Sequence, residues 1–429
     1  MVEIRPFRAI RYTSKAGELK NLITQPYDKI TPEMQKKYYE NSIYNYCRLI
    51  LPIEDERYEI AKERLNKFFA EKIFEKDTHP GIYVYYQNFE LFGKKYLRKG
   101  FICAMKLSSF EENVVLPHEK THKSPKIDRL NMLRATLKNL EPGFMLYSDP
   151  KKVTVKIFDE VANSTPLIDV IDEYNVRNRI WKIEDPERIQ AVQKVLEPET
   201  VVIADGHHRY ETALTFRDEL RAKNPNWSED NAFNFCMTFL VPVEDEGLII
   251  LPGHRVLLHL TLTEKEINEI KKYFNVSEIT RANVELFLRN NQKKICFVAY
   301  TGNQRYYGLV LKDFDNISQF FKPEYSEEYK HLDVVVLRDV IFEGIMNARE
   351  LKIDVDIVYS RWINDAIEMV DSGRAKVAFL LNATRPEQVL TIAKNHERMP
   401  EKSTDFYPKI ISGLTMMDIA PDEKLSKDY

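Results

Sequence analysis

The chain has 429 residues, enough for two or three domains at about 150 residues per domain. Hydrophobic side chains make up 44% and charged side chains 30% of it, a balance that excludes collagen-like, low-complexity and disordered proteins. The 63 basic and 66 acidic side chains leave a net charge of −3, so no overall positive field attracts nucleic acid. Only a local basic groove stays open as a nucleic-acid site.

Neither the amino-terminal segment nor any other stretch approaches the roughly 18 apolar residues that span a bilayer. The four cysteines are far apart and form no CxxC pair, which predicts buried free thiols and no structural zinc. They are Cys47, Cys103, Cys236 and Cys296. We therefore expect a cytoplasmic protein with no membrane segment.

The hydrophobic spacing of the first half alternates between strand and helix periods. It predicts strands or hairpins at 3–12, 43–52, around Phe92-Gly93, 143–147 and 200–204, and helices at 32–40, 58–70, 128–140, 186–196 and 207–222. Strands interleaved with helices favour mixed layers over an all-α bundle.

The second half continues in the same way. It predicts helices at 263–274, 333–347, 360–372 and 386–395, a hairpin of 295–299 with 306–311, a strand at 377–381 and an extended carboxyl-terminal segment. The expected fold class is mixed α/β (α+β) with mixed sheets. Motif placement divides it into a region 1–240 that binds nucleotide and substrate and an additional α+β domain 241–429, whose carboxyl-terminal segment returns to the site.

The segment VVIADGHHRYETALTF, residues 201–216, joins an apolar strand to a helix through Asp205 and Gly206. The start of a helix presents backbone N–H groups and a positive dipole, which suit a phosphate. His207, His208 and Arg209 add side-chain donors there.

Asp205 has three readings: it caps the helix, binds Mg²⁺ or orients a histidine. In the alternative without function, Asp205 is a helix cap and the histidines only satisfy polar contacts. A zinc site of the HEXXH type is excluded, because neighbours in a helix point about 100° apart.

A second polar cluster lies in LPHEKTHKSPKIDRLNMLRATLKNLEPGF, residues 116–144. Glu119 beside His118 has the chemistry of a general base. Lysines and arginines such as Lys120 and Arg134 could hold an acidic substrate or nucleotide phosphates. The alternative is a solvated basic loop followed by a helix with an ordinary polar face.

A third cluster is RMPEKSTDFYPKIISGL, residues 398–414, where Lys402, Ser403 and Thr404 offer hydroxyl and ammonium donors for a carboxylate or phosphate. A terminal strand that packs its aromatic residues is the alternative. Asp28 lies in a turn before a helix, as a cap or as an acid facing a cleft. Pro252-Gly253-His254-Arg255 forms a similar turn with weaker specificity.

The segments ADGHHRYETA (204–213), HEKT (118–121) and MPEKSTDFYPK (399–409) resemble, over nearly the full length, a widespread prokaryotic family carried as a domain of unknown function. The Asp-Gly-His-His-Arg turn also resembles the phosphate-binding motif of free-serine kinases. Those enzymes share a ParB/sulfiredoxin-like fold and phosphorylate the hydroxyl of L-serine with ADP or ATP. This second resemblance is local, and the chain is considerably longer than those kinases.

The kinase resemblance implies that Gly206, His207, His208 and Arg209 hold the transferring phosphate. Asp205 then places Mg²⁺ or the substrate. A separate carboxylate takes the serine proton, with Asp28 and Glu119 as candidates. Phosphoryl transfer needs mainly positioning and charge neutralisation, so the absence of a GxxxxGK[ST] loop does not oppose it.

The leading hypothesis is a small-molecule kinase that makes O-phosphoserine from L-serine with ATP or ADP and Mg²⁺. Its catalytic residues would be Asp28, Glu119, Asp205 and His208, and Arg134, Lys402, Ser403 and Thr404 would bind substrate. The alternatives are a nucleotide-binding regulatory protein of ParB-like type and a phosphoester or nucleotide hydrolase. We expect no nucleic-acid or membrane partner, and a homodimer stays open.

Overall fold

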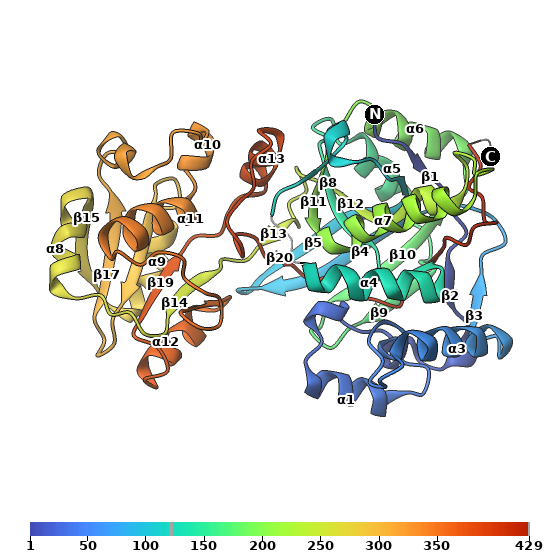
Figure 1. Ribbon diagram of the computed structural model, residues 1–429, viewed down its shortest axis with the longest axis horizontal. Helices are drawn as coiled ribbons and strands as arrows, with labels where there is room; N and C mark the ends of the chain where they lie inside the picture. Colours follow the sequence, from blue (N-terminus) through green and yellow to red (C-terminus); the bar gives the residue numbers. More distant parts are fainter. Residues whose placement is uncertain (120–122, 428–429) are drawn as a thin grey trace. The chain divides into compact units, whose positions relative to one another are not determined.

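The computed structural model describes residues 1–119 and 123–427 (Figure 1). The chain forms two compact units. Unit 1 consists of Met1–Pro117, Thr121–Ile249 and Pro408–Tyr429, and unit 2 of His118–Lys120 and Ile250–Tyr407. By sequence we expected the division at residue 240. The structure divides the chain at residues 249–250 and groups the last 22 residues, Pro408–Tyr429, with unit 1.

Unit 1 is built on a mixed sheet, nine-stranded in the described residues, with the order β6-β11-β8-β12-β5-β4-β10-β9 and β1 paired to β5. The pairs β6–β11 and β8–β12 are parallel, and the others are antiparallel. The strands are β1 (Ile4–Arg5), β4 (Ile82–Leu91), β5 (Lys94–Lys106), β6 (Val115–Pro117), β8 (Gly143–Tyr147), β9 (Ile168–Ile171), β10 (Arg177–Ile183), β11 (Val201–Asp205) and β12 (Phe235–Pro242).

The helices of unit 1 are α1 (Pro32–Asn41), α2 (Cys47–Ile50), α3 (Arg57–Ala70), α4 (Lys123–Thr136), α5 (Val153–Ala162), α6 (Pro186–Leu196) and α7 (His207–Lys223). Helices α5, α6 and α7 pack on the mixed sheet, and residues of α2, α3 and α4 form a second hydrophobic cluster. Short two-stranded pairs join β2 (Ile10–Tyr12) to β3 (Phe74–Lys76) and β7 (Lys138–Asn139) to β21 (Met417–Asp418). Helices α4 and α7 lie side by side (Figure 1).

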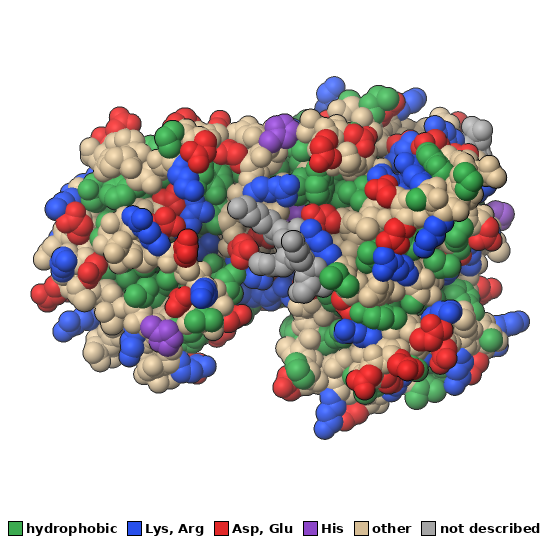
Figure 2. Space-filling model, viewed as in Figure 1, with side chains coloured by type: hydrophobic (Ala, Val, Ile, Leu, Met, Phe, Trp, Pro, Cys, Tyr) green, Lys and Arg blue, Asp and Glu red, His purple; other side chains and the backbone are tan. Residues whose placement is uncertain are grey.

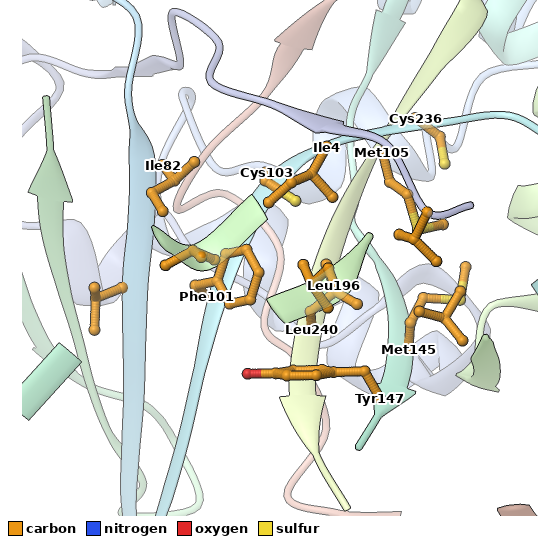
Figure 3. Close-up of a cluster of buried hydrophobic side chains, with 14 of the residues drawn as sticks. Ile4, Ile82, Phe101, Cys103, Met105, Met145, Tyr147, Leu196, Cys236 and Leu240 are labelled. Atoms are coloured by element: carbon orange, nitrogen blue, oxygen red, sulfur yellow. The ribbon is translucent and has the colours of Figure 1, made fainter. Parts of the chain in front are cut away.

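The main core of unit 1 lies between the sheet and α5, α6 and α7. Phe101 of β5, Tyr147 of β8 and Leu240 of β12 point into it beside Leu196 of α6 (Figure 3). All four cysteines are buried free thiols, as predicted. Strands β8 and β12 are buried along their whole length, so the centre of the sheet is covered on both faces, and this burial supplies the hydrophobic driving force for the fold.

Unit 2 has its own six-stranded sheet of order β15-β17-β16-β19-β14-β18, antiparallel throughout. Its strands are β14 (His254–Leu257), β15 (Phe274–Ile279), β16 (Cys296–Tyr300), β17 (Tyr306–Leu311), β18 (Ile357–Ser360) and β19 (Val377–Leu381). The short strands β13 (Ile249–Ile250) and β20 (Phe406–Tyr407) pair with each other in a two-stranded sheet of their own. Its helices are α8 (Glu264–Tyr273), α9 (Val284–Asn290), α10 (Glu327–Lys330), α11 (Asp333–Val336), the π-helix η8 (Leu337–Ile345), α12 (Ile363–Asp371) and α13 (Pro386–Lys394). The predicted mixed α/β class is confirmed.

Three predicted elements are wrong or shifted. The predicted strand 43–52 contains the helix α2 instead, because Tyr46 is fully buried and its carbonyl accepts from the backbone N–H groups of Leu49 and Ile50. The helix predicted at 128–140 begins at Lys123 and ends at Thr136, since Leu137 takes a left-handed φ of 52°. The helix predicted at 333–347 is α-helical only to Val336 and then widens into η8.

Acidic and basic side chains are interspersed on the face shown in Figure 2, in keeping with the nearly balanced net charge. Within the described ranges, no helix is long and apolar enough to cross a membrane.

Candidate phosphate site in unit 1

The turn between β11 and α7 has the strand-to-helix geometry that the sequence predicts. The apolar residues of β11 are buried, and the strand ends at Asp205. Gly206 follows with φ 92°, and the 17-residue helix α7 begins at His207. A Cβ atom on Gly206 would lie 2.8 Å from Nε of Arg209, so both the backbone and the guanidinium require glycine here.

Asp205 is held by two cations. Its Oδ2 atom accepts a hydrogen bond from Nζ of Lys409 at 3.0 Å, and its Oδ1 atom lies 3.8 Å from Nη2 of Arg209. Burial raises the pKa of this carboxyl, but Lys409, Arg209 and Lys29 together outweigh burial and hold the pKa well below its usual range. Asp205 is therefore ionised at neutral pH and acts as an anchor for the cations.

Arg209 is a cation that the surrounding structure holds in place. Its side chain is 13% exposed, and Nη1 donates to the carbonyl of Pro142 at 2.7 Å. Burial lowers the pKa of Arg209, but the neighbouring Glu141, Asp205 and Asp28 raise it above its ordinary value. Its buried Nε has no hydrogen-bond partner among the described residues. Arg209 is thus a fixed cation with one N–H donor left over.

Asp28 lies in the short 3₁₀ turn η3 (Tyr27–Lys29), close enough to Arg209 to influence its charge. Nζ of Lys29 is 3.4 Å from Oδ2 of Asp28, and the Asp28 side chain is 36% exposed. The turn is fixed because the backbone N–H of Tyr27 donates to Glu141 at 3.1 Å. Asp28, far away in the sequence, is therefore near enough to the Asp205–Arg209 turn to interact electrostatically with Arg209 within unit 1.

Glu141 and Lys409 are site residues that the sequence did not single out. Oε1 of Glu141 also accepts from Oγ of Ser412 at 2.7 Å, so this carboxylate joins Tyr27 to the carboxyl-terminal segment. Lys409 is part of the FYPK segment quoted above, which was the available signal. Glu141 follows a helix in a common Glu-Pro-Gly turn, and this pattern gave no signal of a functional role.

His207 and His208 are the first two residues of α7. His207 is 8% exposed and His208 is half-buried. The backbone carbonyl of His208 accepts from Oγ1 of Thr212 at 2.7 Å, a normal contact inside a helix. The two rings differ in burial, so they do not present equivalent donors to the turn.

Arg134 lies on α4, and its guanidinium bonds to Glu219 of α7, with Nε 3.0 Å from Oε2. Its Nη1 atom also donates to Asn131 at 2.9 Å, and the side chain is 46% exposed. In the structure Arg134 therefore joins two helices, and its role as a substrate ligand stays a prediction.

The other predicted residues lie in unit 2. Nε2 of His118 is 2.7 Å from Oγ1 of Thr404, and residue Glu119 pairs with Met399 through a parallel β-bridge. Ser403 is buried, and its hydroxyl donates to the carbonyl of Pro400. Lys402 is exposed and has a left-handed φ of 58°.

Residues 118–119 and 399–404 thus contact each other in unit 2. Lys120 and His122, which the sequence placed in the same polar cluster, lie outside the described residues. Within those described residues, no group of three or more His, Cys, Asp or Glu side chains could hold a metal ion.

Residues 4–335 match the family described as "Protein of unknown function (DUF1015)". The chain belongs to this family. The predicted membership of a family of unknown function is therefore confirmed, and no curated protein matches the chain.

Several solved structures are similar to it at low identity. A free serine kinase in complex with AMP has 13% identity, covers 71% of this chain and 88% of its own, and gives a TM-score of 0.33. A conserved hypothetical protein from Pyrococcus furiosus has 14% identity, 70% and 92% coverage and a TM-score of 0.31. SbnI with a C-terminal truncation from Staphylococcus aureus has 8% identity, 74% and 88% coverage and a TM-score of 0.34. Likeness at this level supports no conclusion on activity.

Proposed function

We propose that this protein is a small-molecule kinase that transfers a phosphoryl group from ATP or ADP to the hydroxyl of free L-serine. The observation that carries the proposal is Arg209, a buried cation at the start of α7 with an Nε donor that has no partner in the described chain. An unsatisfied buried N–H is costly, and a phosphate oxygen would satisfy it. The resemblance of the turn to the free-serine kinase motif supports the same reading.

The turn offers the remaining parts of a phosphate site. The first backbone N–H groups of α7 and the helix dipole favour negative charge, and left-handed Gly206 keeps a side chain out of the approach. Lys409 is held by Asp205 beside Arg209, so two cations are fixed before the nucleotide arrives. Fixed cations neutralise charge on the transferring phosphoryl group without reorganisation during the reaction.

In the proposed reaction the serine hydroxyl oxygen forms a bond to phosphorus, and the bond from that phosphorus to the bridging oxygen of the nucleotide breaks. Asp28 takes the hydroxyl proton and later returns it to water, while the shortened nucleotide leaves with the bond's electron pair. Asp28 is favoured as the base because it belongs to the same unit as Arg209 and interacts with it electrostatically. Glu119 is the second candidate.

Mg²⁺ fits this site only as a partner of the nucleotide. The described residues hold no cage of three ligands, but Mg²⁺ commonly takes one or two carboxylates with phosphates and water. Asp205 is the protein ligand in this proposal, and the ion would neutralise phosphate charge. His208 as a catalytic residue, and Arg134, Lys402, Ser403 and Thr404 as substrate ligands, are further parts of the proposal.

The test is incubation of the purified protein with MgCl₂, ATP or ADP, and L-serine, with phosphoserine and nucleotide followed by mass spectrometry. We expect phosphoserine in a one-to-one ratio with nucleotide consumed. Release of inorganic phosphate without phosphoserine would identify a hydrolase instead. Nucleotide binding without turnover would favour the regulatory alternative.

Two variants locate the reaction at the turn. Arg209→Lys keeps the charge but loses the guanidinium fork, and we expect about a 10²-fold lower rate. His208→Ala is expected to lower the rate by about 10²-fold. The matched control is Arg188→Ala, on the exposed side of α6, which should keep the full rate. Equal rates in all four proteins would remove the turn from the mechanism.

A further inference from the structure

Unit 2 contains a cavity of about 740 Å³ that the kinase proposal does not use. Arg255 of β14 lines it and is only 4% exposed. Nη1 of Arg255 donates to the carbonyl of Gly253, and the guanidinium lies 5.1 Å from the ring centre of Tyr359. In the described part of the chain Arg255 forms no ion pair. A buried cation without a direct ion pair is costly even with Glu119 near enough to interact with it electrostatically, which points to an anion that the protein binds here.

The charge of Arg255 persists at neutral pH. Burial lowers its pKa to about 10, with Tyr359 and Glu119 raising it and Arg338 lowering it. Two more arginines line the cavity: Arg338 is already paired with Asp339, and Nη1 of Arg398 donates to the backbone carbonyl of Glu119 at 3.1 Å. Arg255 is therefore a buried cation of the lining that a ligand can neutralise.

The second, independent observation is the π-helix η8. Its residues Arg338, Asp339, Phe342 and Glu343 all line the cavity. A π-helix costs stability relative to an α-helix and is found frequently at functional sites. Its wider turn brings Arg338, Phe342 and Glu343 to one face, so the chain departs from α-helical geometry at the place where it forms this wall.

The charges and aromatic rings of the other side chains that line the cavity indicate which kind of anion fits. Six acidic and four basic side chains of described residues line the cavity, so a polyanion such as a nucleotide would meet net repulsion. Glu343 forms no ion pair within the described residues and offers a site for a cationic group. Phe342, Tyr325 and Tyr359 supply aromatic surface between the charges.

We propose that this cavity binds a small zwitterion, an amino acid or short peptide with an aromatic side chain, whose carboxylate pairs with Arg255 and whose ammonium group faces Glu343. Its aromatic part packs on Tyr359 and Phe342. This proposal does not depend on the proposed kinase function, because the cavity could bind the zwitterion even if the protein transferred no phosphate.

The first experiment is isothermal titration calorimetry of the full-length protein. L-Phenylalanine and glycyl-L-phenylalanine test the free amino acid and the short peptide. 3-Phenylpropanoate and phenethylamine carry one charge each, and AMP tests a nucleotide. We expect saturable binding of at least one zwitterion and at least tenfold weaker binding of both one-charge analogues. Absence of zwitterion binding, equal binding of an analogue, or preferential binding of AMP would overturn the proposal.

Variants then assign the two ends of the ligand. Arg255→Met should reduce zwitterion binding by at least tenfold, and Arg374→Met, an exposed arginine of unit 2 outside this lining, should leave it unchanged. Glu343→Gln should weaken binding of the zwitterion several-fold and leave binding of 3-phenylpropanoate unchanged. This variant also tests the proposal if Arg255→Met does not fold. Unchanged zwitterion binding in the folded variants would contradict the assignment.

Discussion

A Gly-His-His-Arg segment in unit 1 and a Gly-His-Arg segment in unit 2 place a largely buried arginine in opposite surroundings. In unit 1, Gly206 leads into a helix, and Arg209 is surrounded by Asp205, Glu141 and Asp28. In unit 2, Gly253 leads into the strand β14, and Arg255 has no ion pair in the described chain. The residue types alone do not decide the role; the element that follows the glycine does.

The glycines and histidines of the two segments differ for the same reason. Gly206 needs its left-handed φ, whereas a Cβ on Gly253 would lie 2.9 Å from the carbonyl oxygen of Lys402. His207 lies at a helix start. His254 is buried in the sheet, where burial and Arg255 lower its pKa to about 3, so it stays neutral.

The largest expected effect is on Arg209. Arg209→Met leaves three carboxylates near an uncharged side chain, so we expect the free energy of unfolding to fall by about 3–5 kcal/mol. Urea unfolding followed by circular dichroism measures it. A loss below about 1 kcal/mol would show that Arg209 does not compensate these acids.

The second-largest effect is expected for Asp205, which makes the free energy of unfolding depend on pH. Its pKa is lowered in the folded state, so its contribution is present above the unfolded pKa of about 4 and is lost as the pH falls through the folded pKa. Asp205→Asn should cost about 2 kcal/mol at pH 7. The difference from wild type should persist at pH 4 and shrink only in stronger acid. A difference that disappears between pH 7 and pH 5 would contradict the ion pairs with Lys409 and Arg209.

Arg255→Met should behave differently from Arg209→Met. It removes a buried charge that makes no ion pair with a described residue, and this gain offsets the lost electrostatic interaction with Glu119, the contact with Tyr359 and the hydrogen bond to Gly253. We expect a free energy of unfolding within about 1 kcal/mol of wild type or above it, measured in the same urea series. A loss as large as that of Arg209→Met would erase the contrast between the units.

The smallest effect is expected at Arg134. Its pair with Glu219 is exposed, so Arg134→Ala should cost only about 0.2–1 kcal/mol of stability. If Arg134 also binds substrate, the same variant should raise the KM for serine. Glu219→Ala breaks the pair but keeps Arg134, and so separates the two roles.

The long periodic elements were predictable from the sequence, among them α1, α3, α6, α7 and the hairpin of β4 and β5. Short elements were not, because tertiary packing decides them: Tyr46 is buried by its surroundings, and its segment turns into a helix against its β-propensity. The widening of residues 337–345 into a π-helix also has no local signature.

For the site, the sequence predicted the turn because strand, glycine and helix are contiguous. It did not predict that Glu141 would tie Tyr27 to Ser412, since these contacts join segments that are distant in the chain. The roles of Glu119, Lys402, Ser403 and Thr404 stay predictions. The division into units assigns them to unit 2.

The most direct test of the central claim is phosphoryl transfer by the wild-type protein and by Arg209→Lys, with ATP or ADP, Mg²⁺ and isotopically labelled L-serine, read by mass spectrometry. We predict labelled phosphoserine from the wild type and about 10²-fold less from the variant. Unchanged serine and nucleotide after prolonged incubation of the wild type would contradict the proposed function.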